Sequence, residues 1–399
     1  MTASRVDVAV VGGGPAGALT AMLLANRGRA VVLLERAPQW RWRACGVFAS
    51  PASVAALRSI GFREPELELL ARPVEAMRVE SPGGASFRLT YEGSGALEDS
   101  AVGFDRSTLD PLLLDRARSA GAEVRLGATV EQLALSGDRA RLTISGDASE
   151  LIARVVVGAD GLRSVVARAA SVDRRSPLGP RAALTFHLID AWGDRDARMV
   201  VVDDGYVGIA PVPGGRVNVG IVLGRSWFER LRREGGRAVA HAICASVFPD
   251  GAASAEALRP LDRVAGVTPL GHAVARRAGA AWLLVGDAAG FLDPFTGEGL
   301  HRAIVSAGLA AATIDAVLAG RAGGRLEDYD RAMRAGFATK DLVSRIVQGF
   351  LGQPGLFEYA ARRLAARERV RATMGQVMGD IVPAAHALDP RFLAALLAP

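Results

Sequence analysis

The chain is poor in the residues that hold metals and disulfide frameworks. Its 399 residues include two cysteines, Cys45 and Cys244, which form no CxxC pair. The five histidines are isolated and lack the HxxxH or HxH spacing of a metal centre. We therefore expect neither a disulfide framework nor a metal site.

Lysine is almost absent, because Lys340 is the only one and the other 47 of the 48 basic residues are arginines. A formal charge of +6 and an isoelectric point near 10 are compatible with a nucleic-acid partner. However, the arginines are dispersed among acidic residues, and no basic stripe is interleaved with aromatic residues. Genomic composition bias explains the arginine excess better, and we expect no nucleic-acid partner.

Long apolar runs are missing as well. No uninterrupted apolar segment approaches the roughly 18–20 residues that span a bilayer. The first hydrophobic stretch, Val6 to Val11, is too short for a signal peptide and contains Asp7. We therefore expect a cytoplasmic protein. Half of the residues are hydrophobic and the 46 glycines are scattered, which argues against disordered, collagenous and coiled-coil classes and indicates a globular protein.

The N-terminal segment contains a complete strand–helix–strand unit around a glycine-rich turn. Residues 6–11 have the composition of a buried parallel strand, and they run directly into the sequence Gly-Gly-Gly-Pro-Ala-Gly at 12–17. A helix follows to near Gly28, and a second strand ends at Glu35. A GxGxxG motif between a strand and a helix, with an acid at the end of the next strand, is typical of a dinucleotide-binding site.

Each part of this motif has a physical task. Gly12 permits the tight turn, Gly14 lets a pyrophosphate approach the backbone, and Gly17 allows close helix packing. The helix amides face the phosphate, and Glu35 accepts hydrogen bonds from ribose hydroxyls. The alternative is a purely structural glycine turn, which the flanking strands make less favourable. The predicted cofactor residues of this unit are Gly12, Gly14, Ala16, Gly17, Glu35 and Arg36.

Two later strands also end in an acidic residue. Residues 155–164 form a strand that ends in Asp160-Gly161, and residues 282–290 form one that ends in Gly286-Asp287. Open α/β sheets bind ligands at the carboxyl ends of their strands. We therefore expect both acids to lie at the edge of the sheet that also carries the glycine turn.

Together these three segments resemble the flavoprotein superfamily of aromatic hydroxylases, flavin halogenases and geranylgeranyl reductases, over about residues 5–330. The resemblance implies FAD as the cofactor. It implies that Asp287 binds the ribityl and pyrophosphate region and that Asp160-Gly161 lies where cofactor and reductant meet. It also matches Arg106 to an arginine that contacts the cofactor, at the start of a helix capped by Asp105 or Ser107. A surface salt bridge is the alternative role for Arg106.

Two segments resemble the geranylgeranyl-reductase branch in particular. The run Pro294-Phe-Thr-Gly-Glu-Gly-Leu300 matches a loop that meets the isoalloxazine ring, where backbone amides at a helix start favour negative charge on reduced flavin. This match adds Pro294, Gly297, Gly299 and Leu300 to the cofactor site, and Glu298 is the matching acid and a candidate catalytic residue. Its alternative is an ordinary carboxylate in the first turn of a helix.

Cys45-Gly46 matches a Cys-Gly pair that reductases of this branch carry beside the flavin. We assign both residues to the cofactor site and Cys45 to catalysis, because a thiol there can donate a proton after hydride transfer. We expect the neighbouring Arg41 and Arg43 to favour the thiolate. The alternative is that Cys45 is a small buried apolar residue.

The substrate side departs from that branch. Its reductases carry a Tyr-x-Trp-x-Phe-Pro run, where this chain has Tyr206, Gly208 and Ala210. We assign these three residues to the substrate site, and the loss of two large side chains leaves room for a wider or more polar substrate. A halogenase is disfavoured, because Trp40-x-Trp42 is not followed by Ile-Pro and the catalytic lysine is missing.

The fold class that follows is α/β: an FAD-binding Rossmann-type (GR2-like) domain, an inserted β-sheet substrate domain and a C-terminal helical region. We expect the FAD-binding domain at 1–70, 101–175 and 266–330, the substrate domain at 71–100 and 176–265, and the helical region at 331–399. The helical region is expected to pack on the body, line a substrate tunnel, pair with another subunit or touch a membrane surface.

The predicted function is that of an FAD-dependent oxidoreductase that transfers hydride from reduced FAD to a carbon–carbon double bond of a hydrophobic small molecule. A flavin-dependent monooxygenase of an aromatic or polyketide-type substrate is the alternative. A flavoprotein fold that has lost catalysis is disfavoured by the intact cofactor motifs. No second GxGxxG lies in a strand–helix context, so we expect NAD(P)H to dock transiently or a redox partner to reduce the flavin.

Overall fold

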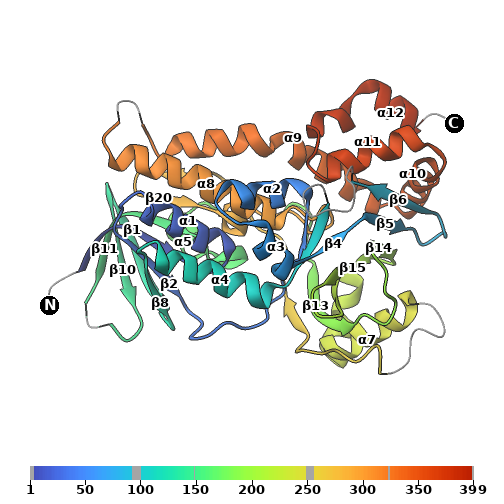
Figure 1. Ribbon diagram of the computed structural model, residues 1–399, viewed down its shortest axis with the longest axis horizontal. Coiled ribbons are helices and arrows are strands. Elements are labelled where there is room, and N and C mark those ends of the chain that lie inside the picture. Colours follow the sequence, from blue (N-terminus) through green and yellow to red (C-terminus); the bar gives the residue numbers. More distant parts are fainter. Residues whose placement is uncertain (1–3, 92–99, 148, 249–255, 322–323, 398–399) are drawn as a thin grey trace.

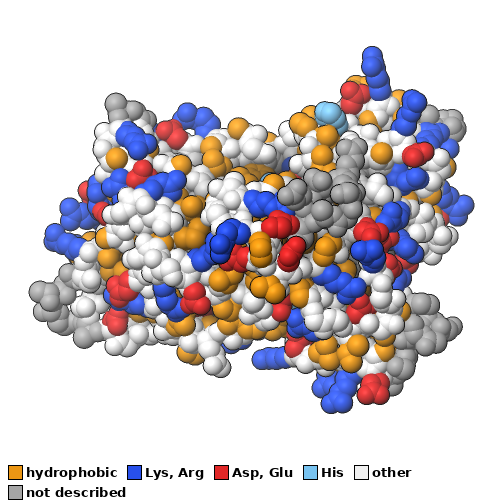
Figure 2. Space-filling model, in the orientation of Figure 1, with side chains coloured by type: hydrophobic (Ala, Val, Ile, Leu, Met, Phe, Trp, Pro, Cys, Tyr) orange, Lys and Arg blue, Asp and Glu red, His pale blue; other side chains and the backbone are white. Residues whose placement is uncertain are grey.

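The computed structural model describes residues 4–91, 100–147, 149–248, 256–321 and 324–397. Figure 1 shows an α/β domain on the left, a β-rich region at the lower right and a helical region at the upper right. Arginines and acidic residues are interspersed over the face shown in Figure 2. Many of them pair, as Arg88 does with Asp196 at 2.7 Å.

The α/β domain is built on an eight-stranded sheet. Its central strand, β1 (Ser4–Val11), pairs in parallel with β11 (Leu151–Gly158) on one side and with β2 (Val31–Glu35) on the other. The last four residues of β1 are buried, as expected of a parallel strand covered on both faces. The remaining strands are β8 (Glu123–Leu126), β9 (Val130–Ser136), β10 (Arg139–Ile144), β19 (Ala278–Gly279) and β20 (Trp282–Leu284).

Helices cover one face of this sheet. α1 (Pro15–Ala25), α4 (Arg106–Ser119) and α8 (Gly299–Leu318) share one apolar core with α2 (Pro51–Ser59). The opposite face packs on α5 (Val165–Ala169) and on the β9–β10 hairpin. α8 is long and apolar enough to cross a membrane, but half of its apolar window is buried inside the protein.

A second sheet of seven strands forms the β-rich region. Its outer face packs on α7 (Gly236–Val247), beside the shorter helix α6 (Phe228–Glu234), and its inner face packs on the C-terminal helices. The strand order begins at β17 (Ala265–Val267), β13 (Ala182–Ile189), β16 (Arg216–Leu223) and β15 (Gly205–Val212), and ends with β14 (Ala197–Val202), β5 (Ala76–Glu80) and β6 (Ser86–Thr90).

Strand pairing moves two of the expected domain boundaries. β4 (Ala71–Val74), which follows α3 (Glu64–Leu70), pairs with β7 (Ala101–Phe104) and not with the substrate sheet, which therefore begins at Ala76 and not at residue 71. At the far end, β17 pairs with β13, so the substrate sheet extends to Val267. The third strand beside β7 is β3 (Phe48–Ala49). Residues 92–99 of the predicted substrate domain lie outside the described residues.

The C-terminal region is helical, as expected. α9 (Glu327–Leu351) begins slightly before the expected boundary at 331 and lies along α8 (Figure 1). Its side chains pack with the inner face of the substrate sheet, so the region is part of the body of the protein. The other helical segments are α10 (Pro354–Ala366), α11 (Glu368–Met378), a 3-10 segment at Ala384–Leu388 and α12 (Pro390–Leu397).

The contact between β7 and β15 generates a stability prediction. A Cβ atom added to Gly103 would lie 1.9 Å from the carbonyl oxygen of Pro211. The two sheets therefore approach each other so closely here that only glycine fits. We expect Gly103→Ala to lower the free energy of unfolding by about 1–3 kcal/mol through overpacking, measured as a fall in the thermal midpoint. Gly308→Ala is the matched control, because its Cβ meets open space inside α8 and a helical alanine is favoured. Equal midpoints for the two variants would contradict the close packing.

Candidate functional site

Three strand ends meet at one edge of the eight-stranded sheet. Val11 of β1 lies beside Gly158 of β11, and Gly158 lies beside Leu284 of β20. The residues that follow these strands are therefore neighbours. They are the glycine turn, Asp160 and Gly286-Asp287, as the sequence predicts.

The glycine turn is closely packed on its inner side and open on its outer side. Gly12 has φ of +108°, and a Cβ on it would lie 2.4 Å from the Ala159 carbonyl oxygen. A Cβ on Gly17 would lie 2.0 Å from the Gly12 carbonyl oxygen, so α1 begins in direct contact with the turn. A Cβ on Gly14 would meet no protein atom within 4 Å. The turn thus leaves space in front of Gly14 for a ligand.

The start of α1 is suited to an anion. No side chain caps its first turn, and no acidic residue lies in that turn. The first N–H groups of a helix have no partner within the helix, and together with the helix dipole they attract phosphate. Ala16 is buried behind this end, against Gly286 of the β20 turn.

Glu35 is a buried carboxylate held by three donors. Its Oε2 atom accepts from the backbone N–H of Gly13 at 2.8 Å. Its Oε1 atom accepts from the N–H of Ala37 at 2.9 Å and from Nη2 of Arg43 at 2.7 Å. Burial opposes the charged form, but Arg43 and the two backbone donors outweigh it and lower the pKa of Glu35. Glu35 is therefore a charged acceptor, and it lies in the wall of a pocket.

That pocket begins at the glycine turn and ends at α4. Its position between Gly14 and Glu35 fits the adenosine half of a dinucleotide. Arg36, by contrast, is exposed. The partner of Glu35 is instead Arg43, a contact that the sequence did not predict. The lining residues are Gly13, Gly14, Glu35, Ala37, Gln39, Trp40, Arg43, Asp110, Pro111, Leu114, Asp115, Arg118 and Leu126.

Arg106 joins the start of α4 to the Cys45-Gly46 loop. It is 8% exposed, and its Nη1 atom donates to the Gly46 carbonyl oxygen at 2.8 Å. Its Nε and Nη2 atoms donate to Asp110 at 2.7 and 3.0 Å. Asp105 is the cap, since it accepts from the Ser107 N–H at 2.9 Å. The salt bridge of Arg106 is thus a buried one that orients the guanidinium toward the loop.

Cys45 is half-buried, and its thiol is protonated. Burial raises the pKa of Cys45 to about 11, although the nearby Arg106 and Arg43 act in the opposite direction. The expectation of a thiolate at Cys45 is therefore wrong: Arg43 does favour the charged form, but desolvation outweighs its effect on the pKa of Cys45. Cys45 and Cys244 both carry free thiols.

The two strand-end acids differ in their partners. One oxygen of Asp160, Oδ2, accepts from the Val165 N–H at 2.6 Å, whereas Oδ1 is buried without a hydrogen-bond partner in the described part of the chain. Burial raises the pKa of Asp160 despite that hydrogen bond. Burial also raises the pKa of Asp287 to about 6, with Arg106 and Arg302 acting against it. Gly161 has φ of +74° and continues the turn after Asp160.

The loop at 291–299 leads into α8 and lies close to the Cys45 loop. Gly297 has φ of +70°, and a Cβ on it would lie 2.5 Å from the Phe48 ring. The loop therefore packs directly on β3, which follows Cys45-Gly46. Gly299 begins α8 and Leu300 is buried in the core of the α/β domain, while Pro294 is half-buried in the loop.

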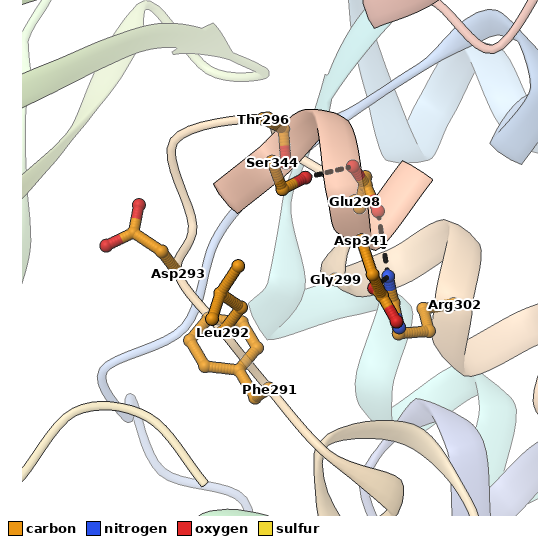
Figure 3. A pocket seen from close by; sticks show the side chains of 9 residues that line it. All are labelled: Phe291, Leu292, Asp293, Thr296, Glu298, Gly299, Arg302, Asp341 and Ser344. Carbon is orange, nitrogen blue, oxygen red and sulfur yellow. Dashed lines mark hydrogen bonds and ion pairs between the residues drawn. The ribbon is translucent and has the colours of Figure 1, made fainter. Parts of the chain in front are cut away.

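Glu298 faces α9. Its carboxylate accepts from Arg302 Nη2 at 3.1 Å and from Ser344 Oγ at 3.2 Å (Figure 3). Lys340 Nζ lies 3.9 Å from the same carboxylate. Arg302 also forms an ion pair with Asp341 of α9, at 2.5 Å. The structure thus gives the Glu298 carboxylate ionic partners from α8 and α9, and its catalytic role stays a prediction.

The three residues predicted to contact substrate, Tyr206, Gly208 and Ala210, lie on the inner face of β15. The Tyr206 hydroxyl donates to Asp293 Oδ1 at 2.5 Å, so Asp293 is a partner that sequence reasoning missed. A Cβ on Gly208 would make only ordinary contacts, the nearest at 3.6 Å from Met199, which leaves room there. Ala210 is buried in the packing between the two domains, together with Val47.

Trp42 fixes the Cys45 loop to the substrate sheet. Its Nε1 atom donates to the Thr185 carbonyl oxygen at 3.1 Å, and its ring lies 4.4 Å from that of His187. His187 is oriented in turn by Asp262 at 2.6 Å. The sequence offers no signal for this contact, because Trp42 and Thr185 are far apart along the chain.

The residues present fit FAD. The open space at Gly14, the uncapped start of α1 and the pocket at Glu35 adjoin one another, and the unpartnered Asp160 Oδ1 follows β11 at the same edge of the sheet. Gly12, Gly14, Ala16 and Gly17 would hold the pyrophosphate, Glu35 the ribose and Asp287 the ribityl chain. In the described residues, no group of three or more His, Cys, Asp and Glu side chains is arranged to hold a metal ion.

Comparison with known proteins agrees with this geometry. The sequence pattern of the family described as FAD binding domain matches residues 5–343. The chain belongs to this FAD-binding family. It is also 30% identical over 328 residues to a digeranylgeranylglycerophospholipid reductase of Methanoculleus marisnigri, with 77% of this chain and 76% of that protein covered. The protein is therefore an FAD-dependent oxidoreductase of the geranylgeranyl-reductase branch.

Solved structures share the fold of this flavoprotein. A geranylgeranyl bacteriochlorophyll reductase-like protein of Thermoplasma acidophilum superimposes with a TM-score of 0.77 at 22% identity, covering 99% of both chains. The flavin-dependent halogenase CmlS superimposes with a TM-score of 0.70 at 25% identity, covering 92% of this chain and 66% of that one. The first likeness is evidence for the α/β fold with its C-terminal helices.

The open side of the glycine turn predicts the effect of a bulky residue there. Gly14→Val places its side chain where the protein has no atoms, so the variant should fold and yet exclude the pyrophosphate. We expect purified Gly14→Val to have the parent's circular dichroism and almost no flavin absorbance. Full flavin content in this variant would refute the phosphate-loop assignment.

Glu35 predicts the strength of binding at the adenosine end. We expect Glu35→Ala to weaken FAD binding by about 1–3 kcal/mol, the range for an unmade hydrogen bond to a charged group. Turnover at saturating FAD should survive. Fluorescence titration of the apoprotein measures this, with Glu123→Ala on the exposed end of β8 as the control. Unchanged affinity in Glu35→Ala would remove Glu35 from the site.

Proposed function

We propose that this flavoprotein reduces a carbon–carbon double bond of a hydrophobic, isoprenoid-type small molecule. The observation that carries the proposal is the free Cys45 thiol in a loop that Arg106 holds at Gly46, in a chain that is 30% identical to a digeranylgeranylglycerophospholipid reductase. Reduced FAD, when bound, supplies a hydride. The residues of the chain then have to position the acceptor, deliver one proton and exclude water.

Cys45 delivers the proton. Hydride addition to one carbon of the double bond moves the bond's electron pair to the neighbouring carbon, which takes the proton of the Cys45 thiol. Arg106 and Arg43 lie close enough to act electrostatically on the sulfur, and they stabilise the thiolate that remains. A thiol with a pKa of about 11 is protonated at neutral pH, so Cys45 carries its proton before hydride transfer.

The 291–299 loop and the start of α8 would also act on the cofactor. The backbone N–H groups of Glu298 to Leu300 stand at the start of α8, whereas the Gly297 N–H donates to the Pro294 carbonyl oxygen at 3.0 Å. The groups at the helix start would favour negative charge on reduced FAD. Glu298 holds this helix start through Arg302 and α9. We infer that its contribution to catalysis is exerted through that position.

The substrate lies between the 291–299 loop and the inner face of the substrate sheet. Gly208 pairs with Gly220 across the β15–β16 ladder, so two positions of this face lack side chains. The space left by the missing side chains at Gly208 and Gly220 supports an acceptor that is broader than a single extended prenyl chain. We propose that FAD is reduced either by NAD(P)H that binds transiently near Asp160-Gly161 or by a redox partner.

The product distinguishes this reaction from oxygenation. Reduced protein is mixed with unsaturated isoprenoid lipids in one arm without oxygen and in another with oxygen, and the products are weighed by mass spectrometry. We expect the gain of two hydrogen atoms in both arms. The gain of an oxygen atom, confined to the aerobic arm, would identify a monooxygenase and overturn the proposal.

Cys45→Ser tests the proton donor. Serine is of similar size but holds its proton far more tightly, so we expect slower flavin reoxidation by the acceptor, with flavin reduction and stability unchanged. In the parent, the raised pKa keeps the thiol protonated, so this rate should stay flat from neutral pH upward and fall only as the pH approaches about 11. A rate in Cys45→Ser equal to the parent's would return Cys45 to a packing role.

A further inference from the structure

α9 carries a row of buried polar side chains on the face that it turns toward the 291–299 loop. Lys340, Ser344 and Gln348 follow one another at four-residue spacing and are 6%, 8% and 4% exposed. Residues four apart lie on the same face of a helix. Buried polar side chains need partners, and these three find them at the two ends of the loop.

Gln348 holds the first end, at Asp293. Its Nε2 atom donates to Asp293 Oδ1 at 2.7 Å. Arg181, which stands just before β13, donates from Nη1 to Gln348 Oε1 and to Asp293 Oδ2, both at 2.6 Å. With the Tyr206 hydroxyl also on Asp293, this one carboxylate joins the loop, the substrate sheet and α9.

Ser344 and Lys340 hold the second end, at Glu298. Ser344 donates to Glu298 Oε1, and Lys340 Nζ stands 3.9 Å from the same oxygen. Lys340 also donates to the Val377 carbonyl oxygen and to Asp380, both at 2.6 Å, which ties α9 to the end of α11. Figure 3 shows Glu298 turned toward Ser344 and Asp293 turned the opposite way, toward the substrate sheet.

We propose that Gln348, Ser344 and Lys340 are positioning residues that fix both ends of the 291–299 loop relative to the substrate sheet. Residues 294–297 lie between the two fixed ends, so their position over the cofactor depends on α9. The FAD-family match ends at residue 343, and Ser344 and Gln348 lie beyond it. The C-terminal helical region thereby contributes to the flavin site.

The charge at Asp293 makes the arrangement testable. Its side chain is 2% exposed, and its neighbours supply donors from Arg181, Tyr206, Gln348 and the Phe295 N–H. Gln348→Glu would place a second carboxylate against Asp293 in a buried site, which is strongly unfavourable. Asp293→Asn combined with Gln348→Glu would restore one carboxylate for Arg181, one amide donor between the two positions and the original net charge.

The experiment compares both single variants with the double variant in FAD-loaded, full-length protein. Two readouts need no acceptor: the visible circular dichroism of the bound flavin and its midpoint potential. We expect Gln348→Glu to change both, and to slow flavin reoxidation by the acceptor about tenfold or more while FAD remains bound. The double variant should recover to within about threefold of the parent. Arg345→Ala, on the exposed face of α9, should leave all readouts unchanged.

A parent-like flavin spectrum, potential and reoxidation rate in Gln348→Glu would overturn the proposal, as would a double variant no better than the worse single one. Gln348→Leu, which adds no charge, covers the case in which Gln348→Glu does not fold, and it should shift the same readouts less. The reoxidation readout rests on the proposed reaction, whereas the spectrum and the potential rest only on bound FAD. A shifted spectrum with no alkene turnover in the parent would therefore refute the proposed function alone.

Discussion

The parallel pairing of β1 with β11, and of β11 with β20, is the constraint on which the site depends. This pairing ends all three strands at one edge, so segments from the start, the middle and the last third of the chain meet there. The contact between Gly12 and Gly17 then sets where α1 begins, and no larger residue fits at either position. The backbone itself therefore forms the edge at which the predicted phosphate site lies.

The Cys45 loop and the 291–299 loop are each held in part by groups from outside the Rossmann-type domain. The Cys45 loop is fixed by Arg106 of α4 and, through Trp42, by Thr185 of the substrate sheet. The 291–299 loop is fixed at Asp293 by the substrate sheet and at Glu298 by α9. The inserted sheet and the C-terminal helices therefore both contact the loops that border the predicted flavin site, which is where members of one fold can differ in chemistry.

The sequence predicts the features that depend on local pattern. The glycine turn, Glu35 and the strand-end acids Asp160 and Asp287 lie where their motifs place them, because strand, turn and helix are neighbours along the chain. Contacts between side chains of separate segments are not predictable from these motifs, whether the residues are eight apart, as for Arg43 and Glu35, or far apart. Arg43 on Glu35 and Asp293 on Tyr206 join segments whose approach is set by tertiary packing. The error at Cys45 has the same origin, since nearby arginines are visible in the sequence and burial is not.

Anaerobic reoxidation of the reduced flavin is the most direct measurement of the central claim, that this site delivers hydride to an alkene. The protein is reduced without oxygen and mixed with an unsaturated isoprenoid lipid or its saturated counterpart, while the flavin absorbance is followed. We expect the oxidised flavin band to return with the unsaturated lipid only. A band that stays bleached with both lipids and returns only when oxygen is admitted would contradict it.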